Sequence, residues 1–181
     1  MSTGHKIENQ SGLYFVTFTI VDWIDVFIKS EYMDIIIDSL KYCRKEKGLM
    51  VGAFVVMSNH VHLIVHAKNN NLSDVIRDLK RHTAKRIIQK LESNLNDRNK
   101  WILEKFKFAA INSSSNYQVW MHRNRPIALE TIKFIKQKLI YIHLNPVRAG
   151  LVEKSEHWLY SSERNYMTDM EVVMEIDLID L

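Results

Sequence analysis

Apolar and polar positions alternate through residues 13–20 (LYFVTFTI), where threonine is interleaved with aromatic and β-branched side chains, and this pattern predicts a β-strand. Two further apolar runs, residues 49–57 and 60–66, are separated only by Ser58 and Asn59. A two-residue break between strand-like runs predicts a tight antiparallel hairpin. Residues 117–121 (YQVWM) are compatible with another short strand.

Helical periodicity separates these strands. Residues 31–48 predict an amphipathic helix that ends at Gly48, because glycine readily adopts the left-handed conformation found at helix ends. Residues 71–92 predict a second helix with Ser73 as its N-cap. Its apolar face comprises Leu72, Val75, Ile76, Leu79, Thr83 and Ile87.

A last helix is expected from Pro126 onward, because proline is favoured in the first turn. It is expected to stop at Asn145 and Pro146, since the residue before a proline is pushed out of the α region. Strands and helices in this order predict an α+β fold with a mainly antiparallel sheet flanked by helices. The apolar stripe of the last helix comprises Ile132, Ile135, Leu139 and Ile142.

The length of 181 residues fits one domain, residues 1–181, with a core at about 13–166 and an acidic tail at 169–181. The apolar runs are far shorter than a membrane span, and the first ten residues lack the apolar segment of a signal peptide. Cys43 is the single cysteine, which excludes an internal disulfide and a cysteine-based zinc site. We therefore expect a cytoplasmic protein with no membrane partner.

Charge is distributed unevenly along the chain. Residues 77–90 carry six basic side chains and one acidic side chain, whereas the tail carries five acids and no base. Since the net charge is +4, residues 1–168 alone carry +9. Such a balance favours a polyanionic partner such as nucleic acid, although a solvated helix face would have the same pattern.

Two histidines interrupt the apolar run of the second hairpin strand. Because side chains alternate across a strand, His60 and His62 are expected on one face, about 7 Å apart at their bases, where both can reach one metal ion. His66 has the same parity but lies roughly 13 Å from His60, too far for the same ion. Imidazole suits divalent metals, and a third ligand must come from elsewhere. The alternative is a partly buried pair that holds no ligand.

A second group of residues lies near the end of the last predicted helix. Tyr141 and Asn145 are spaced i,i+4 and share a helix face, with Lys138 one turn before Tyr141. A tyrosine hydroxyl can act as a nucleophile, and an amide oxygen is a suitable ligand for a divalent ion. Taken singly, each also has a structural interpretation: Tyr141 as a packing residue, Asn145 as a helix cap and Lys138 as an exposed lysine.

Four segments resemble, in order and spacing, the REP-associated tyrosine transposases, which are relatives of the single-strand transposases of small bacterial insertion sequences: VVMSNHVHLIV, LSDVIRDLKRHTAKRI, YIHLNPVRAGLVEK and WLYSSERNY. The resemblance extends from about Tyr14 to Tyr166. It implies a ferredoxin-like core of the HUH type and a metal-dependent single-stranded DNA endonuclease or transposase. The implied partner is single-stranded or hairpin DNA, and the relatives act as monomers or homodimers.

The resemblance also implies roles for individual residues. His60, His62 and Asn145 would hold Mg²⁺ or Mn²⁺, and Tyr141 would attack a phosphodiester to form a 5′-phosphotyrosine. Insertion-sequence relatives commonly have glutamine at the position of Asn145, and many family members have proline at the position of Ser58. Basic and aromatic side chains are the candidates for DNA contacts: Arg77, Lys80, Arg81, Lys85, Trp120, His122, Arg123, Arg125 and Arg148. Two of these have a structural alternative, Trp120 as a core residue and Arg148 as an anchor of the turn through backbone carbonyls.

Two other functions remain open at this point. The segment HVHLIVH is similar to the histidine-triad pattern of nucleotide hydrolases, but Ile64 occupies the position of an alternating histidine. A transposase-derived protein that binds DNA without turnover would keep the basic surface. Two arrangements are likewise open for the acidic tail, which either docks on the domain or folds over the basic surface and competes with DNA.

Overall fold

The computed structural model describes residues 6–122, 126–167 and 169–180. Its centre is a four-stranded antiparallel sheet in the order β2-β3-β1-β4. The strands are β1 (Tyr14–Thr19), β2 (Leu49–Val56), β3 (His60–Ala67) and β4 (Ile127–Ala128). The predicted α+β class with a mainly antiparallel sheet is confirmed.

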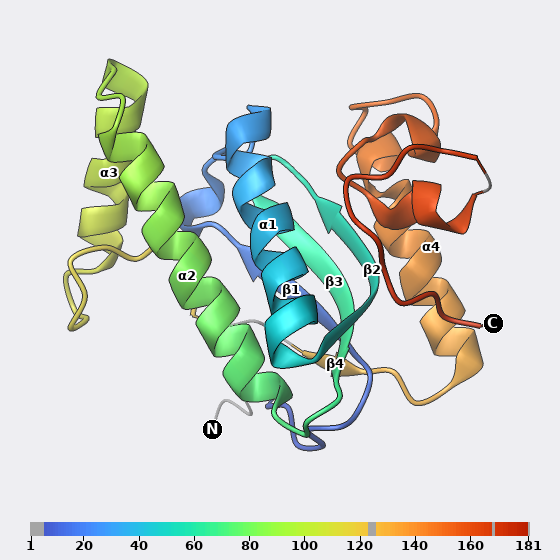
Figure 1. The fold of residues 1–181 in the computed structure, drawn as a ribbon. Coiled ribbons are helices and arrows are strands. Elements are labelled where there is room, and N and C mark those ends of the chain that lie inside the picture. The colour runs from blue at the N-terminus through green and yellow to red at the C-terminus, as the bar shows by residue number, and fades with distance from the viewer. Residues whose placement is uncertain (1–5, 123–125, 168, 181) are drawn as a thin grey trace.

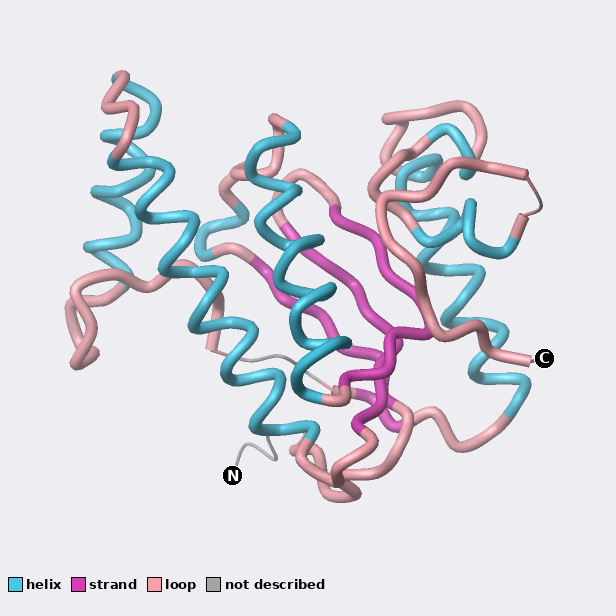
Figure 2. Tube along the Cα trace, viewed as in Figure 1, coloured by secondary structure: helices cyan, strands magenta, loops and turns pink. Residues whose placement is uncertain are grey.

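Helices cover both faces of this sheet (Figure 1). α1 (Ser30–Lys47) and α2 (Leu72–Glu92) lie on one face, and α3 (Asp97–Ala109) packs against α2. α4 (Ile132–Arg148) lies on the opposite face beside the C-terminal segment. The order β1-α1-β2-β3-α2-β4 is ferredoxin-like, as expected, with α3 inserted before β4 (Figure 2). Within the described ranges, no helix combines the length and the apolar character needed to cross a membrane.

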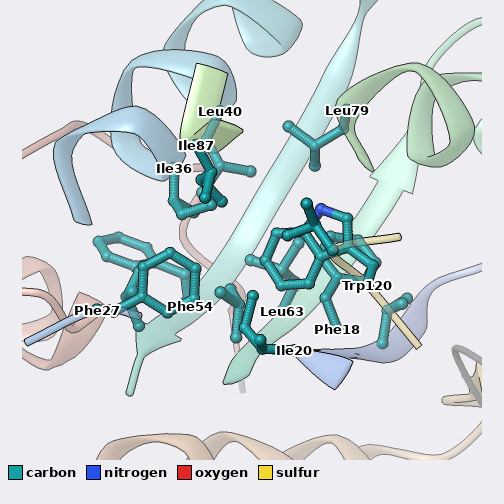
Figure 3. Close-up of a cluster of buried hydrophobic side chains, with 14 of the residues drawn as sticks. Phe18, Ile20, Phe27, Ile36, Leu40, Phe54, Leu63, Leu79, Ile87 and Trp120 are labelled. Atoms are coloured by element: carbon teal, nitrogen blue, oxygen red, sulfur yellow. The ribbon is translucent and has the colours of Figure 1, made fainter. Parts of the chain in front are cut away.

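Strand alternation divides the side chains of the sheet between two cores. Phe18, Phe54 and Leu63 point beneath α1 and α2, where they join the larger core (Figure 3). Side chains of the opposite parity face α4. His60 and His62 belong to this second set. The smaller core on the α4 face comprises Phe15, Ala53, Val55, Met57, Ile64, Leu129, Leu139 and Ile142.

The predicted hairpin and the end of the first helix are confirmed. Val56 pairs with Val61 across the turn at Ser58 and Asn59. Gly48 follows the last residue of α1 with a φ of 67°, the left-handed conformation that favours glycine at this position.

The start of α2 differs from the prediction. Asn71, rather than Ser73, occupies the N-cap position. The Ser73 N–H donates instead to Oε1 of Gln10 at 2.8 Å, and Nε2 of Gln10 donates to the Ser73 hydroxyl at 2.8 Å. A glutamine 63 residues away along the chain therefore satisfies part of this helix end, which the local sequence could not reveal.

α4 starts and ends later than predicted. The helix begins at Ile132 rather than at Pro126, because residues 127–128 pair with β1 as β4. It does not stop at Asn145 and Pro146 but continues for two residues beyond the proline. Proline removes a single helical hydrogen bond, and the buried Pro146 lies in the last turn, where little helix remains to be disrupted.

Residues 117–121 form no regular strand. Trp120 makes an isolated bridge with Ile20 beyond the end of β1, and the Met121 N–H donates to the Thr19 carbonyl at 2.8 Å. Trp120 is 5% exposed and packs against Phe18 in the larger core (Figure 3). The prediction that Trp120 offers a stacking surface to DNA is therefore wrong.

The acidic tail docks along the edge strand β2. The Asp177 N–H donates to the Val51 carbonyl, and the Val51 N–H donates to Oδ2 of Asp177, both at 2.8 Å. Nε of Arg44 in α1 donates to the same carboxylate at 3.1 Å. The described tail residues thus cover a strand edge that would otherwise be open to pairing. This is the docked arrangement, and it places the tail beside α4 and away from α2 (Figure 1).

Candidate functional site

His60 and His62 meet α4 on the smaller core's side of the sheet. Their ring centroids lie 4.7 Å apart, and the His62 ring lies 5.2 Å from the Tyr141 ring. Asn145, one turn after Tyr141, lies close enough to His60 to influence the pKa of that imidazole. The structure therefore brings together, within one chain, four residues that the sequence had singled out in two distant segments.

Neighbouring side chains hold one nitrogen of each imidazole. Oγ1 of Thr17 lies 2.8 Å from Nδ1 of His62, and Oδ1 of Asn59 lies 2.7 Å from Nδ1 of His60. An amide oxygen only accepts, so Nδ1 of His60 donates to Asn59. Such partners fix the tautomer and direct the other ring nitrogen toward a ligand.

Sequence reasoning missed both of these partners. Thr17 lies opposite His62 in the β1–β3 register, and Asn59 precedes His60 in the hairpin turn. A signal was present, because Thr17 is a polar position in an otherwise apolar strand. The local sequence could not show that Thr17 faces His62, because the two residues are 45 positions apart and meet only through the strand register.

The donor set fits a divalent ion. Nε2 of His62 is buried without a hydrogen-bond partner, and since buried polar atoms normally have one, this nitrogen points to a ligand. The described residues contain no group of three His, Cys, Asp or Glu side chains that could hold a metal. A third protein ligand must therefore be of another type, and the amide of Asn145, which lies near enough to His60 to affect its pKa, has a suitable oxygen.

Burial lowers the pKa of both histidines. The pKa of His62 falls to about 3, mainly through burial and further through the neighbouring His60 and Lys138. Burial also lowers the pKa of His60, although the neighbouring Asn145 side chain opposes this shift. Both imidazoles are therefore neutral at pH 7, which is the form that binds metal ions.

Tyr141 is half-buried between aromatic and cationic groups. Its ring packs edge-on against Phe15 with the centroids 5.9 Å apart. Nζ of Lys138 lies 5.5 Å from the centroid of the Tyr141 ring, and the guanidinium carbon of Arg148 lies 5.7 Å from it. Two positive charges beside the Tyr141 ring attract phosphate to this part of the surface.

A second basic region follows α2. A groove of about 760 Å³ lies between this helix and residues 115–122. Burial lowers the pKa of Lys80 to about 8, and Nζ of Lys80 donates to the Met121 carbonyl at 3.0 Å. The groove is lined by six of the candidate DNA-binding residues: Arg77, Lys80, Arg81, Lys85, His122 and the largely buried Trp120.

Ion pairs along α2 neutralise part of this charge. Arg77 pairs with Asp74 at 2.6 Å, and Arg81 pairs with Asp78 at 3.2 Å. The structure therefore splits the candidate DNA-binding residues into two places, the α2 groove and, for Arg148, the end of α4. Arg123 and Arg125 lie outside the described residues.

Ser162, His143 and Glu163 resemble a hydrolytic triad without being one. Oγ of Ser162 lies 2.9 Å from Nε2 of His143, and His143 pairs with Glu163. Ser162 is fully buried, and its Oγ also accepts from the Phe54 N–H at 2.9 Å. A substrate cannot reach this hydroxyl, so the network anchors the C-terminal segment to α4 and β2.

The ferredoxin-like sheet thus carries a histidine pair against a tyrosine-bearing helix. The chain belongs to the IS200-like transposase family, whose model matches residues 19–121. The match includes His60 and His62 and ends before α4.

Relatives extend the similarity over the tyrosine helix. A Haemophilus influenzae protein named as a REP-associated tyrosine transposase is 23% identical over 164 residues, which cover 90% of this chain and 85% of that protein. A solved structure of a REP-associated tyrosine transposase bound to a REP hairpin covers 100% of this chain and 95% of its own, with a TM-score of 0.66 at 17% identity. The predicted resemblance to these transposases is confirmed, and the structural likeness shows the shared fold.

Proposed function

We propose that this DNA transposase cleaves and rejoins single-stranded DNA at or near hairpins through a covalent bond to Tyr141. The observation that carries the proposal is the contact of Tyr141 with His62 and of His62 with His60. Asn145, on the same helix as Tyr141, lies near enough to His60 to influence the pKa of that imidazole. Family membership supports DNA as the substrate, and the hairpin bound to the structural relative supports a hairpin as its form.

Tyr141 is the proposed nucleophile. Its hydroxyl oxygen attacks the scissile phosphorus in line with the 3′ oxygen, so that a phosphorus–Oη bond forms as the phosphorus–O3′ bond breaks. The phenol loses its proton and the 3′ oxygen gains one, which leaves a 5′-phosphotyrosine and a free 3′-OH. Lys138 and Arg148 stabilise the negative charge that develops between phenol and phosphate.

His60, His62 and Asn145 are the proposed ligands of Mg²⁺ or Mn²⁺. A divalent ion held by these residues would supply Lewis-acid stabilisation of the scissile phosphate. The lowered pKa values keep both imidazoles neutral, and Thr17 and Asn59 orient the two rings. Because the phosphodiester is exchanged for a phosphotyrosine, a 3′-OH can reverse the step and rejoin the strand.

Covalent capture of labelled DNA tests the proposal. Hairpin oligonucleotides from palindromes that flank the gene are labelled at either end, incubated with Mn²⁺, Mg²⁺ or EDTA, and separated on a denaturing gel. A 5′-phosphotyrosine predicts that the 3′-end label migrates with the protein, whereas the 5′-end label is released on a shorter fragment. The adduct should require the metal and vanish in Tyr141→Phe.

A matched control is Tyr42→Phe, since Tyr42 is 58% exposed on α1, on the opposite side of the sheet. Its adduct yield should equal that of the unmodified protein. If hairpins bind tightly but no adduct forms with either metal, the chain is a DNA-binding protein without turnover. An adduct that persists in Tyr141→Phe would assign the nucleophile to another residue.

A further inference from the structure

The turn after β1 has an unusual backbone. Asp22 and Trp23 both have a φ of 54°, in the short helical turn η1 (Val21–Trp23). Bulky side chains rarely adopt a positive φ, and glycine occupies neither position. Strain of this kind persists where the surrounding structure imposes it, and it concentrates at functional sites.

The strained residue is also an exposed aromatic beside the candidate site. Trp23 is 58% exposed, in contrast to Trp120, which is 5% exposed in the core. The centroid of the Trp23 ring system lies 6.1 Å from the His60 ring, with the ring planes at 71°. Burial does not explain why a tryptophan occupies this position.

Asn59 links the turn to the histidine pair. Nδ2 of Asn59 donates to the Trp23 carbonyl at 3.2 Å and to Oδ1 of Asp25 at 3.0 Å. Oδ1 of Asn59 lies 2.7 Å from Nδ1 of His60. One amide therefore orients the His60 imidazole and holds the backbone that presents Trp23.

Four rings in successive contact connect Trp23 to the proposed nucleophile. Tyr141 contacts His62 at 5.2 Å, His62 contacts His60 at 4.7 Å, and His60 contacts Trp23 at 6.1 Å. The exposed indole therefore lies at the end of this row opposite to the proposed nucleophile.

The charges at the two ends of this row differ. Lys138 and Arg148 lie beside Tyr141, whereas Asp22 precedes Trp23 and Asp25 follows it by two residues. Arg98 also donates to the Asp25 carbonyl, so the Trp23 end carries both signs of charge. The indole face itself accepts a base from any nucleotide.

We propose that Trp23 is a positioning residue that stacks on an unpaired base next to the cleaved phosphodiester, so that the scissile phosphate is held between Tyr141 and the histidine pair. This inference rests on the proposed function, because it takes single-stranded DNA as the ligand of the same site. The inference adds that the base, rather than the phosphate, is the part of the nucleotide recognised beside His60.

A protein–DNA mutant cycle measures the stacking directly. Dissociation constants are measured by fluorescence anisotropy for labelled hairpins with a single-stranded flank, in which one abasic position is moved along the flank. Trp23→Ala should weaken binding of the complete DNA by about five- to a hundredfold. It should have no effect on the DNA that lacks the stacked base, and Trp23→Phe should retain most of the affinity. The control Tyr42→Ala removes an equally exposed aromatic from α1 and should behave as the unmodified protein.

Trp23→Gly separates positioning from a structural role. Glycine relieves the positive φ, so the melting temperature should stay the same or rise while the affinity for complete DNA falls. A lower melting temperature together with unchanged affinity would overturn the proposal and assign Trp23 to the fold.

The cycle uses binding alone, so its result does not depend on cleavage. Suppose that the unmodified protein forms the adduct, but that its affinity depends on the abasic position in the same way as that of Trp23→Ala. This result would overturn the stacking and leave the proposed function intact. A base-specific loss without any adduct would support the stacking and reject the cleavage.

Discussion

The two faces of the sheet are built from the same strands and have opposite characters. β1 and β3 direct Val16, Phe18 and Leu63 beneath α1 and α2, where each is at most 3% exposed. The same strands direct Thr17 and His62 toward α4. One face is an apolar core, and the other holds polar groups within a smaller apolar frame.

This difference shows how a site can be held rigidly at a cost in stability. Nε2 of His62 is buried without a hydrogen-bond partner, and the low pKa of His62 reflects the free energy needed to charge it there. Neither feature stabilises the fold. The apolar side chains on the reverse of the same strands supply the burial that fixes the position of each imidazole.

The largest expected effect is the loss of the adduct in His62→Ala. Mutation of a residue that only orients a metal ligand typically lowers activity by up to roughly a hundredfold. Removing a proposed ligand itself should reduce adduct formation by more than that. Titration calorimetry should show a matching loss of Mn²⁺ affinity. His66→Ala is the control, because His66 has the same strand parity but lies further along β3. Equal adduct yields in the two variants would remove His62 from the site.

Leu63→Ala tests the opposite face of the sheet, because Leu63 follows His62 in β3 and its side chain points the other way. Leu63 is fully buried beneath α1 and α2, and its truncation should cost about 2–5 kcal/mol in the free energy of unfolding. Chemical denaturation measures this loss. At low temperature, where the variant remains folded, its Mn²⁺ affinity should stay within a fewfold of the unmodified protein. A large loss of affinity in the folded variant would show that the two faces are not independent.

Thr17→Val should have an intermediate effect. It removes the hydroxyl next to Nδ1 of His62 and should weaken Mn²⁺ binding by about 10–100-fold. Tyr42→Phe also removes one hydroxyl group, but on α1 at the opposite face of the sheet, and should bind Mn²⁺ as before. Calorimetry on both variants decides the matter, and equal affinities would mean that Thr17 does not orient the ring.

Asp177→Asn should have the smallest effect, and one that depends on pH. Burial raises the pKa of the Asp177 carboxyl, but the hydrogen bonds from Arg44 and the Val51 N–H outweigh it, so the pKa lies below its usual value. The carboxylate therefore stabilises the fold above the pKa of the unfolded chain, about 3.9, and this stabilisation is lost as the pH falls through the folded pKa.

Denaturation at several pH values checks this sign. The variant should be less stable than the unmodified protein by about 1–2 kcal/mol at pH 7, and the two should converge below about pH 4. A constant difference across the whole range would show that the charge of Asp177 does not hold the tail.

Local patterns predicted much of the fold and of the site. The alternation in residues 13–20 and 60–66 identified β1 and β3, and the parity of His60 and His62 placed both on one face. The i,i+4 spacing placed Tyr141 and Asn145 together. The same reasoning left Trp120 open between a DNA-stacking surface and the core, and the structure decides for the core, where Nε1 of the indole donates to Oγ1 of Thr83 at 3.1 Å.

The sequence by itself determined the features that depend on residues a few positions apart: strand faces, helix faces and the end of α1 at Gly48. Only the tertiary structure decided that Tyr141 meets His62 of its own chain and that Asn59 holds Trp23 beside His60. It also decided that Thr17 faces His62 and that the tail covers β2. The physical reason is that periodicity and capping act over one or two turns, whereas these contacts depend on strand register and helix docking between distant segments.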